Sequence, residues 1–264
     1  MKIIAPIVFA AAALMFQGIP AAQAADDEIV TIDSRPNVTV SFAVTRPDTE
    51  PKAAAILFTG GNGKLFLWRG RGLRTGNFLV RSRALFAKGG VLAVTVDVPS
   101  DRFAEGLDDF RDSAEHRADI AAVLRWVRAA TTAPVWLVGT SAGTVSVAHL
   151  AASLPVDGAV FTASVTRAGR VRQANVHAGN LEAIRVPVLL VHHRDDQCRV
   201  TPPTEVPEIA ARLRNASKVE TLLFDGGKHP ESGACQAKSA HGFFGIEERV
   251  VGATVRWMIA ALPR

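Results

Sequence analysis

The chain has 264 residues, a hydrophobic fraction of 48% and a formal net charge of +5. This length is sufficient for one large α/β domain with a substantial core, and the composition is that of a globular protein. The positive charge is modest and no nucleic-acid-binding motif accompanies it, so we expect no nucleic-acid partner.

The first 24 residues have the pattern of an export signal. Lys2 precedes an apolar run, residues 3–16, and Ala22-Gln23-Ala24 has the small-x-small spacing of a signal-peptidase site. The run is too short to span a bilayer comfortably, although a buried helix or an uncleaved anchor is the alternative. We expect residues 1–24 to be removed. A single domain, residues 25–264, would remain as a periplasmic or secreted protein without stable membrane insertion.

The next segments predict a sheet with helices on both of its faces. Residues 29–33 and 38–45 are β-rich, and the second segment alternates in polarity as a half-exposed antiparallel strand does. Continuous apolar runs, typical of parallel strands buried on both faces, follow at 54–58, 91–96, 135–138 and 186–191. Helical patterns alternate with these runs, and residues 166–182 are too few for an independent lid domain. The order predicts one α/β domain.

A Gly-Thr-Ser-Ala-Gly sequence, residues 139–143, lies between the apolar run 135–138 and an apolar, helix-compatible stretch, 144–154. This is the strand–turn–helix context of a nucleophile elbow. The turn is too tight for large side chains, so small residues flank the serine and its hydroxyl is pushed outward. Ser141 is therefore the predicted nucleophile, with an ordinary glycine-rich turn as the alternative.

A nucleophilic serine needs a base, and the base needs an acid that orients it. The chain offers candidates in the order Ser, Asp, His, and nearly the whole mature chain resembles the α/β-hydrolase superfamily. Its last third is similar to dienelactone hydrolases and secreted esterases. The resemblance implies the α/β-hydrolase fold, with a mostly parallel sheet, antiparallel N-terminal strands and no large lid. It implies no cofactor and no metal.

The acid is expected just after a late parallel strand. Residues 188–196, Val-Leu-Leu-Val-His-His-Arg-Asp-Asp, resemble the superfamily's strand followed by a G-x-x-D turn, with His193 where glycine is usual. Asp196 falls at the position of the acid. Asp195 is one residue early and would point differently, so we favour Asp196, although both aspartates would also suit turn capping.

Two histidines compete for the role of base. His229 lies in Gly-Gly-Lys-His-Pro, residues 226–230, which resembles the superfamily's G-x-G-H loop. His241 lies in Ala-His-Gly-Phe, residues 240–243, which resembles the H-G-F of dienelactone hydrolases and leads quickly into the last helix. We favour His241 and keep His229 as the alternative.

The cysteines support the same choice. The chain has two, Cys198 and Cys235, and in an oxidising compartment such a pair predicts one disulfide, with two buried thiols as the alternative. A bond between them would link the loop of Asp196 to the loop of His241. Two cysteines at this spacing do not make a zinc site.

The developing oxyanion needs two backbone N–H donors. The resemblance implies Ala142 and, in the loop Thr-Gly-Gly-Asn-Gly at residues 59–63, Gly61. Thr59 replaces the histidine that is frequent in the superfamily. A simple glycine-rich turn is compatible with the loop, whereas a phosphate loop is disfavoured because Lys64 is out of frame for one.

A run of cations lies between residues 64 and 83: Lys64, Arg69, Arg71, Arg74, Arg81 and Arg83. These side chains would attract an anionic substrate, but we favour a solvated loop and helix face.

The sequence as a whole predicts an exported serine hydrolase acting on small-molecule or polymeric esters. Amide, thioester or carbon–carbon cleavage by the same triad is an alternative, as is an inactive secreted binding protein.

Overall fold

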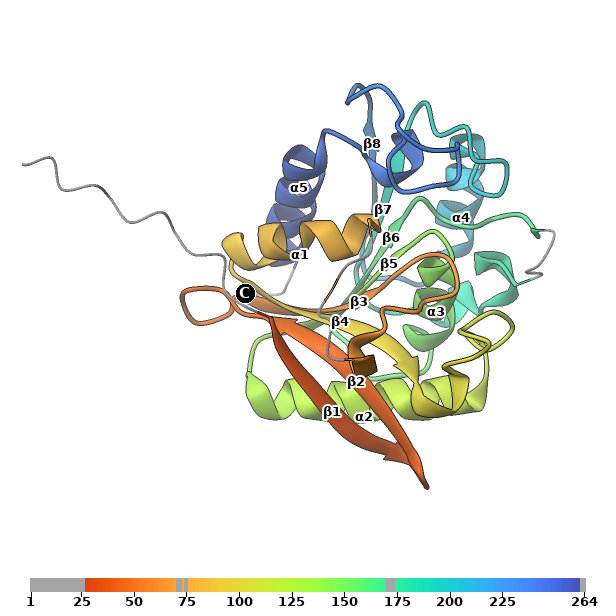
Figure 1. Ribbon diagram of the computed structural model, residues 1–264. Coiled ribbons are helices and arrows are strands. Elements are labelled where there is room, and N and C mark those ends of the chain that lie inside the picture. Colours follow the sequence, from red (N-terminus) through yellow and green to blue (C-terminus); the bar gives the residue numbers. More distant parts are fainter. Residues whose placement is uncertain (1–26, 70–72, 74–75, 170–173, 262–264) are drawn as a thin grey trace, which may run out of the picture.

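An eight-stranded sheet forms the centre of this computed structural model, which describes residues 27–69, 73, 76–169 and 174–261 (Figure 1). The predicted export signal, residues 1–24, lies outside the described residues. The strands are β1 (Glu28–Arg35), β2 (Val38–Thr45), β3 (Ala53–Phe58), β4 (Val91–Pro99), β5 (Val135–Thr140), β6 (Gly158–Thr162), β7 (Val188–His193) and β8 (Val219–Phe224).

The strand order in the sheet is β1-β2-β4-β3-β5-β6-β7-β8. Strand β2 runs antiparallel to both of its neighbours, and every pairing from β4 to β8 is parallel. This confirms a mostly parallel sheet with antiparallel N-terminal strands. The carboxyl ends of β3, β5 and β7 therefore meet at one edge of the sheet, where ligands bind in open α/β sheets.

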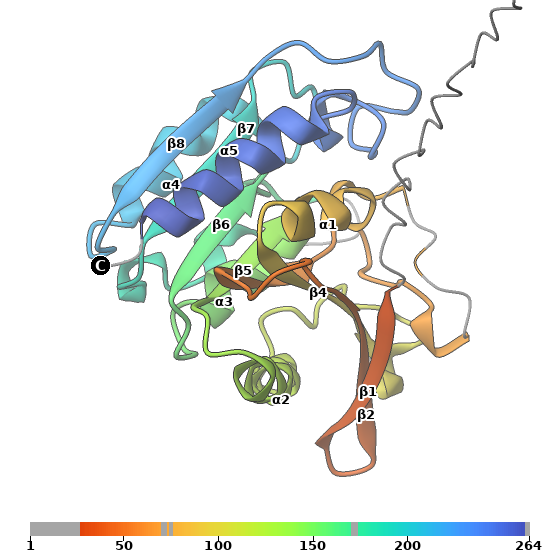
Figure 2. The same cartoon turned by 90° about the vertical axis from the view of Figure 1, so that its left-hand side faces the viewer.

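Among the described residues, five α-helices cover the sheet: α1 (Phe78–Lys88), α2 (Ala114–Ala130), α3 (Gly143–Leu150), α4 (Val206–Arg212) and α5 (Glu247–Ala260). Figure 2 shows α1 and α5 on one face and α2 and α3 on the other. Alternate residues of β3 supply the two cores, because successive side chains of a strand point to opposite faces. Ile56 packs in the core beneath α2, α3 and α4, and Leu57 packs in the core beneath α1 and α5.

Three details differ from the sequence expectations. Strand β4 continues past Asp97 to Pro99, and Asp97 is a buried residue within it. Its carboxylate accepts the backbone N–H groups of Leu65 and Leu67, at 2.7 and 2.8 Å, and this tertiary contact accounts for a buried charge in an apolar strand. Strand β6 and helix α4 were not anticipated, because each is too short to show a clear period.

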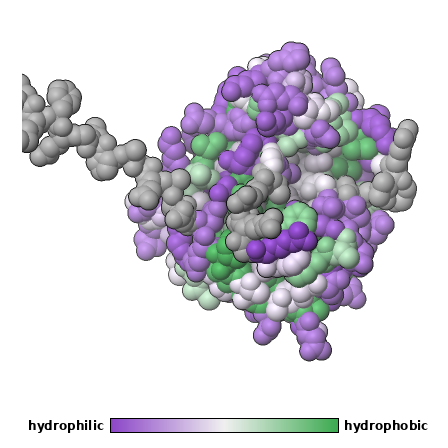
Figure 3. Space-filling view, viewed as in Figure 1, coloured by the Kyte–Doolittle hydropathy of each residue, from purple (hydrophilic) through white to green (hydrophobic). Residues whose placement is uncertain are grey.

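Polar residues cover much of the molecular face in Figure 3, with smaller apolar areas among them. The large apolar side chains that the described residues expose are Ile29, Phe66, Trp68 and Leu223. Trp68 is stacked on Phe103, with 4.7 Å between the ring centroids. Within the described ranges, no helix has the length and apolar character needed to cross a bilayer.

Candidate active site

Ser141 lies in a turn whose shape excludes larger neighbours. Its φ is 52°, in the left-handed region that non-glycine residues rarely adopt, and its N–H donates to the Thr162 carbonyl at 3.0 Å. A Cβ atom on Gly139 would lie 2.5 Å from the Gly143 carbonyl oxygen, and one on Gly143 would lie 2.1 Å from that of Phe58. Both glycines are thus required for the close approach of the strand, turn and helix around Ser141.

Asp196 follows strand β7 and its side chain is fully buried. Its Oδ1 accepts the Cys198 N–H at 2.9 Å, and its Oδ2 accepts the Thr201 hydroxyl at 2.9 Å. Burial alone would raise the pKa of this carboxyl, but hydrogen bonds from His192, His241 and the Cys198 N–H outweigh it. They hold the pKa of Asp196 well below its usual range. The carboxylate therefore stays ionised at neutral pH.

Of the two candidate bases, His241 is the one that contacts Asp196. It lies in a short 3₁₀ turn, Ala240–Gly242, is almost fully buried, and places its Nδ1 atom 3.0 Å from Asp196 Oδ2. With Nδ1–H donating to the carboxylate, Nε2 is left unprotonated and able to accept a proton. Ser141 and His241 line the same small cavity, of about 50 Å³.

Two further side chains, Thr201 and His192, contact the Asp196–His241 pair. Thr201, besides donating to Asp196, has its hydroxyl oxygen 3.1 Å from His241 Nδ1. His192 places Nε2 2.9 Å from the Thr201 carbonyl oxygen and 3.3 Å from Asp196 Oδ2. The sequence analysis did not single out Thr201, because no local pattern distinguishes it from the other threonines.

The alternative residues lie elsewhere. His229 is exposed, and its Nδ1 atom is 3.2 Å from the carbonyl oxygen of the next residue, Pro230. Asp195 is exposed too, and its backbone N–H donates to His193 Nδ1 at 3.0 Å. The geometry that joins acid to base thus involves Asp196 and His241.

The loop between β3 and α1 forms another wall of the cavity. Gly60 and Gly61 both line it, and a Cβ atom on Gly60 would lie 2.9 Å from Ser141 Cβ. Gly61 has a φ of 62°. Ala142, the residue after the serine, is buried at the start of α3. The backbone of Gly61 and Ala142 therefore flanks Ser141 from two different elements.

The predicted disulfide between Cys198 and Cys235 is confirmed. Its half-cystines lie 37 residues apart in sequence, with 4.5 Å between their Cα atoms. Cys235 lines the Ser141 cavity, and the N–H of Cys198 is the donor to Asp196 Oδ1. The bond therefore connects the acid loop directly to a wall of the cavity.

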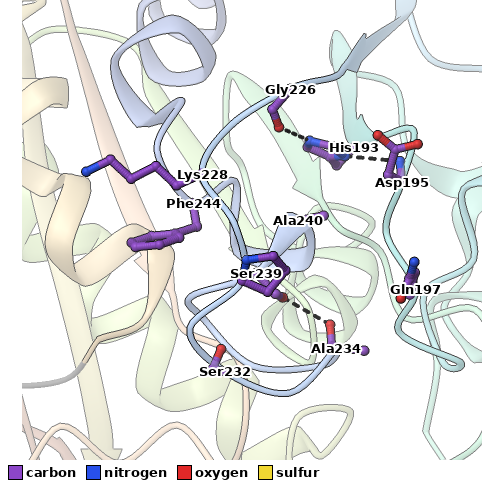
Figure 4. Close-up of a pocket in the computed structure, with 11 residues that line it drawn as sticks. His193, Asp195, Gln197, Gly226, Lys228, Ser232, Ala234, Ser239, Ala240 and Phe244 are labelled. Atoms are coloured by element: carbon purple, nitrogen blue, oxygen red, sulfur yellow. Dashed lines mark hydrogen bonds between the residues drawn. The ribbon is translucent and has the colours of Figure 1, made fainter.

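A second, larger pocket of about 310 Å³ is lined by residues of both loops, among them Gln197 and Ala234 (Figure 4). Figure 4 shows Lys228 and Phe244 on one side of it and Asp195 and Gln197 on the other. Of the described residues, the members of the Ser141–His241–Asp196 group do not line it. The larger pocket is a neighbour of the candidate site and is not the cavity that holds the serine.

Two cations of the basic segment, Arg81 and Arg83, are held by contacts within the fold. Arg81 donates to the Gly242 carbonyl at 2.5 Å and to Glu247 at 2.9 Å, and so holds the backbone next to His241. Arg83 forms an ion pair with Asp27, and Arg69 lies over the ring of Trp68. Arg71 and Arg74 lie outside the described residues. Arg81 and Arg83 are thus bound within the fold, which is a different state from the solvated face we favoured.

Across the described part of the chain, no three His, Cys, Asp or Glu side chains come together in an arrangement able to hold a metal ion.

Comparisons with known proteins show similarity in structure alone. No family model matches the sequence, and no curated protein matches it at a significant level. An α/β serine hydrolase homologue from Coxiella burnetii superposes with a TM-score of 0.63 and 21% identity, over 88% of this chain and 97% of the other.

Two further solved structures are similar over nearly the whole chain. An esterase from Pyrococcus furiosus gives a TM-score of 0.65 at 13% identity. The superposition covers 90% of this chain and 92% of the esterase chain. A dienelactone hydrolase from Anabaena variabilis gives a TM-score of 0.57 at 13% identity. The superposition covers 90% of this chain and 99% of the dienelactone hydrolase chain. At such identities the likeness concerns the fold.

Proposed function

This chain has the α/β-hydrolase fold, and we propose that it is an exported serine hydrolase that cleaves carboxylic esters. One observation carries the proposal. The His241 imidazole lies 3.0 Å from the buried Asp196 carboxylate and shares a cavity with Ser141, which stands on a strained turn. Nucleophile, base and orienting acid are the three parts that acyl transfer by a serine requires.

In the proposed reaction, Ser141 Oγ attacks the carbonyl carbon of the ester while its proton passes to His241 Nε2. The Asp196 carboxylate stabilises the imidazolium, and the N–H groups of Gly61 and Ala142 hold the oxyanion of the tetrahedral intermediate. Collapse of the intermediate breaks the ester C–O bond, and the leaving alkoxide takes the proton from His241. Water, activated by the same histidine, then releases the acyl group from Ser141.

The preference for esters rests on the named activities of similar folds, among them an esterase and a dienelactone hydrolase. The same triad would cleave amides, thioesters or carbon–carbon bonds, because the fold does not determine the chemistry. Initial rates on p-nitrophenyl esters of increasing acyl length, set beside the matching anilides and thioesters, separate these activities. Faster turnover of an anilide than of its ester would contradict the ester proposal.

A fluorophosphonate probe tests the nucleophile itself. We expect one covalent adduct per molecule, because only a serine activated by a base attacks the probe. Intact-mass measurement counts the adducts, and peptide mapping places the label on Ser141. Heat-denatured protein is the control and should stay unlabelled. Native protein that remains unlabelled would instead favour a secreted binding protein of the same fold.

Export predicts a shortened N-terminus. Cleavage after Ala24 would leave a protein that starts at Ala25, and the disulfide supports an oxidising compartment. N-terminal sequencing or intact mass of the protein isolated from outside the cytoplasm measures this. A product that retains Met1 and fractionates with membranes would contradict the cleavage and indicate an anchor.

The disulfide predicts a link between redox state and turnover. We expect Cys198→Ser to lower the free energy of unfolding by up to about 4 kcal/mol, the chain-entropy value for a loop of this length. We also expect kcat to fall by roughly tenfold to a hundredfold well below the melting temperature, because small displacements of catalytic groups are costly. Thermal melts and kinetics measured on the same samples give both quantities.

Leu124→Ala is the matched control for lost stability. Leu124 is buried on α2, and such a truncation costs about 2–5 kcal/mol, yet it lies outside the two loops that the disulfide joins. The control should keep its kcat at the temperature where Cys198→Ser has lost activity. Equal kcat in the two variants would show that the bond stabilises the fold without positioning the triad.

A further inference from the structure

The loop that carries Gly61, residues 59–63, is hydrogen-bonded to residues 107–111, the segment that precedes α2. Three of its carbonyl groups, those of Thr59, Gly61 and Asn62, accept hydrogen bonds from this segment. The Leu107 N–H donates to the Asn62 carbonyl at 2.8 Å. Arg111 Nη2 donates to the carbonyls of Thr59 and Gly61, at 3.0 and 3.2 Å.

The two carbonyls bound by Arg111 bracket one peptide bond. That bond, between Gly60 and Gly61, carries the Gly61 N–H that the proposed mechanism directs at the oxyanion. Because peptide units are planar, holding the units on either side restricts the direction in which this N–H can point. Glycine has few steric restraints of its own. Within the loop the Gly60 carbonyl accepts the Gly63 N–H at a long 3.4 Å, and Arg111 adds a restraint from outside the loop.

Arg111 also contacts α3, the helix that follows Ala142, the second proposed oxyanion donor. Its Nη1 donates to Ser146 Oγ at 3.0 Å, and Ser146 is a buried residue of α3, the helix that begins directly after Ala142. One side chain thus connects the Gly61 loop to the helix that follows the nucleophile. The planar fork of a guanidinium suits this double contact, since its two ends bond in fixed relative directions.

The neighbouring His116 completes the contact on α3. Its Nε2 lies 3.0 Å from Ser146 Oγ. Burial, together with the nearby Arg111 charge, lowers the pKa of His116 to about 3, so the imidazole stays neutral at physiological pH. A neutral ring accepts the Ser146 hydroxyl hydrogen while Arg111 donates to the same oxygen. The network therefore keeps one arrangement across the working pH range.

We propose that Arg111, 2% exposed and distant in sequence from both elements, is the positioning residue of the oxyanion hole. Arg111 is not among the residues that line the Ser141 cavity, and it acts through the backbone of Gly61 and through α3. This role rests on the proposed serine hydrolase function. It adds a residue that the triad and its neighbours do not include.

Arg111→Lys is the principal test. Lysine keeps the charge but lacks the fork, so it cannot hold the loop and α3 together. We expect kcat to fall by about tenfold to a hundredfold, since loss of a whole oxyanion donor costs about 10²–10³. KM should change by less than about threefold, because the ground-state carbonyl makes little use of the hole.

Affinity for a trifluoromethyl ketone, which forms a tetrahedral adduct with the serine, separates positioning from a structural role. Arg111→Lys should weaken this inhibitor by about the same factor as kcat, while the KM of the matching ester stays constant. General loosening of the fold would not selectively weaken the adduct. Arg212→Lys is the matched control, because Arg212 also donates to a backbone carbonyl, that of His177 at 2.8 Å, away from the cavity.

Ser146→Ala provides a second variant should Arg111→Lys fail to fold. It removes the contacts of Arg111 and His116 with α3 and leaves those of Arg111 with the Gly61 loop, and we expect kcat to fall by about threefold to tenfold, in proportion to the smaller loss. Ser82→Ala is its control, because Ser82 is equally buried and its hydroxyl makes no hydrogen bond within the described residues.

The outcomes distinguish the two proposals. Wild-type protein that hydrolyses esters, together with a folded Arg111→Lys variant of unchanged kcat and inhibitor affinity, would overturn the role of Arg111 alone. Wild-type protein that neither hydrolyses esters nor reacts with fluorophosphonate would overturn the proposed function, and the role of Arg111 with it.

Discussion

Ser141→Ala should abolish hydrolysis and fluorophosphonate labelling while leaving the protein folded. Removal of the nucleophile from a serine triad lowers kcat by about 10⁶, and we expect a loss of at least about 10⁴ here. The serine hydroxyl faces a cavity rather than the core, so the free energy of unfolding should change by less than about 0.5 kcal/mol. Ester turnover and thermal melts of the purified variant measure the two effects.

Ser153→Ala is the control for this prediction. Ser153 is exposed just beyond the end of α3, and its hydroxyl donates to the local backbone carbonyls of His149 and Leu150. Its variant should keep full activity. If Ser141→Ala retained more than about one tenth of wild-type turnover, the nucleophile would lie elsewhere in the chain.

His241→Ala should be nearly as severe, whereas His229→Ala should be almost neutral. Without the His241 imidazole there is no group to take the Ser141 proton, and the expected loss in kcat is again about 10⁴ or more. His229 is exposed and contacts its own neighbour, so its replacement should change kcat by less than about twofold. Asp196→Ala should lose no more activity than His241→Ala.

The comparison of the two histidine variants decides which loop is catalytic. Both variants should stay folded, and circular dichroism with thermal melts checks this before kinetics are compared. If His229→Ala were inactive and His241→Ala active, the base would lie in the glycine-rich loop after β8. That result would refute the role proposed for His241.

Some features of this protein were determined by short stretches of sequence. The elbow is one of them, because the small residues around Ser141 and the apolar runs on either side are visible in the local sequence. The closest contact of Gly143, with the Phe58 carbonyl, comes from strand β3. The buried parallel strands are another, since continuous apolar runs are typical of strands covered on both faces. The fold class followed from these runs and their order.

Other features were decided only by the tertiary structure, because they depend on contacts between distant residues. Two histidines follow β8, and the contact that brings His241 rather than His229 against Asp196 spans 45 residues. Thr201 and Arg111 have no local signature, and their partners come from other loops and from α3. Strand β6, five residues long, is stabilised by parallel pairing with β5 on one side and β7 on the other. Local patterns report local sterics and periodicity, whereas the direction of a donor toward a distant acceptor is set when the chain folds.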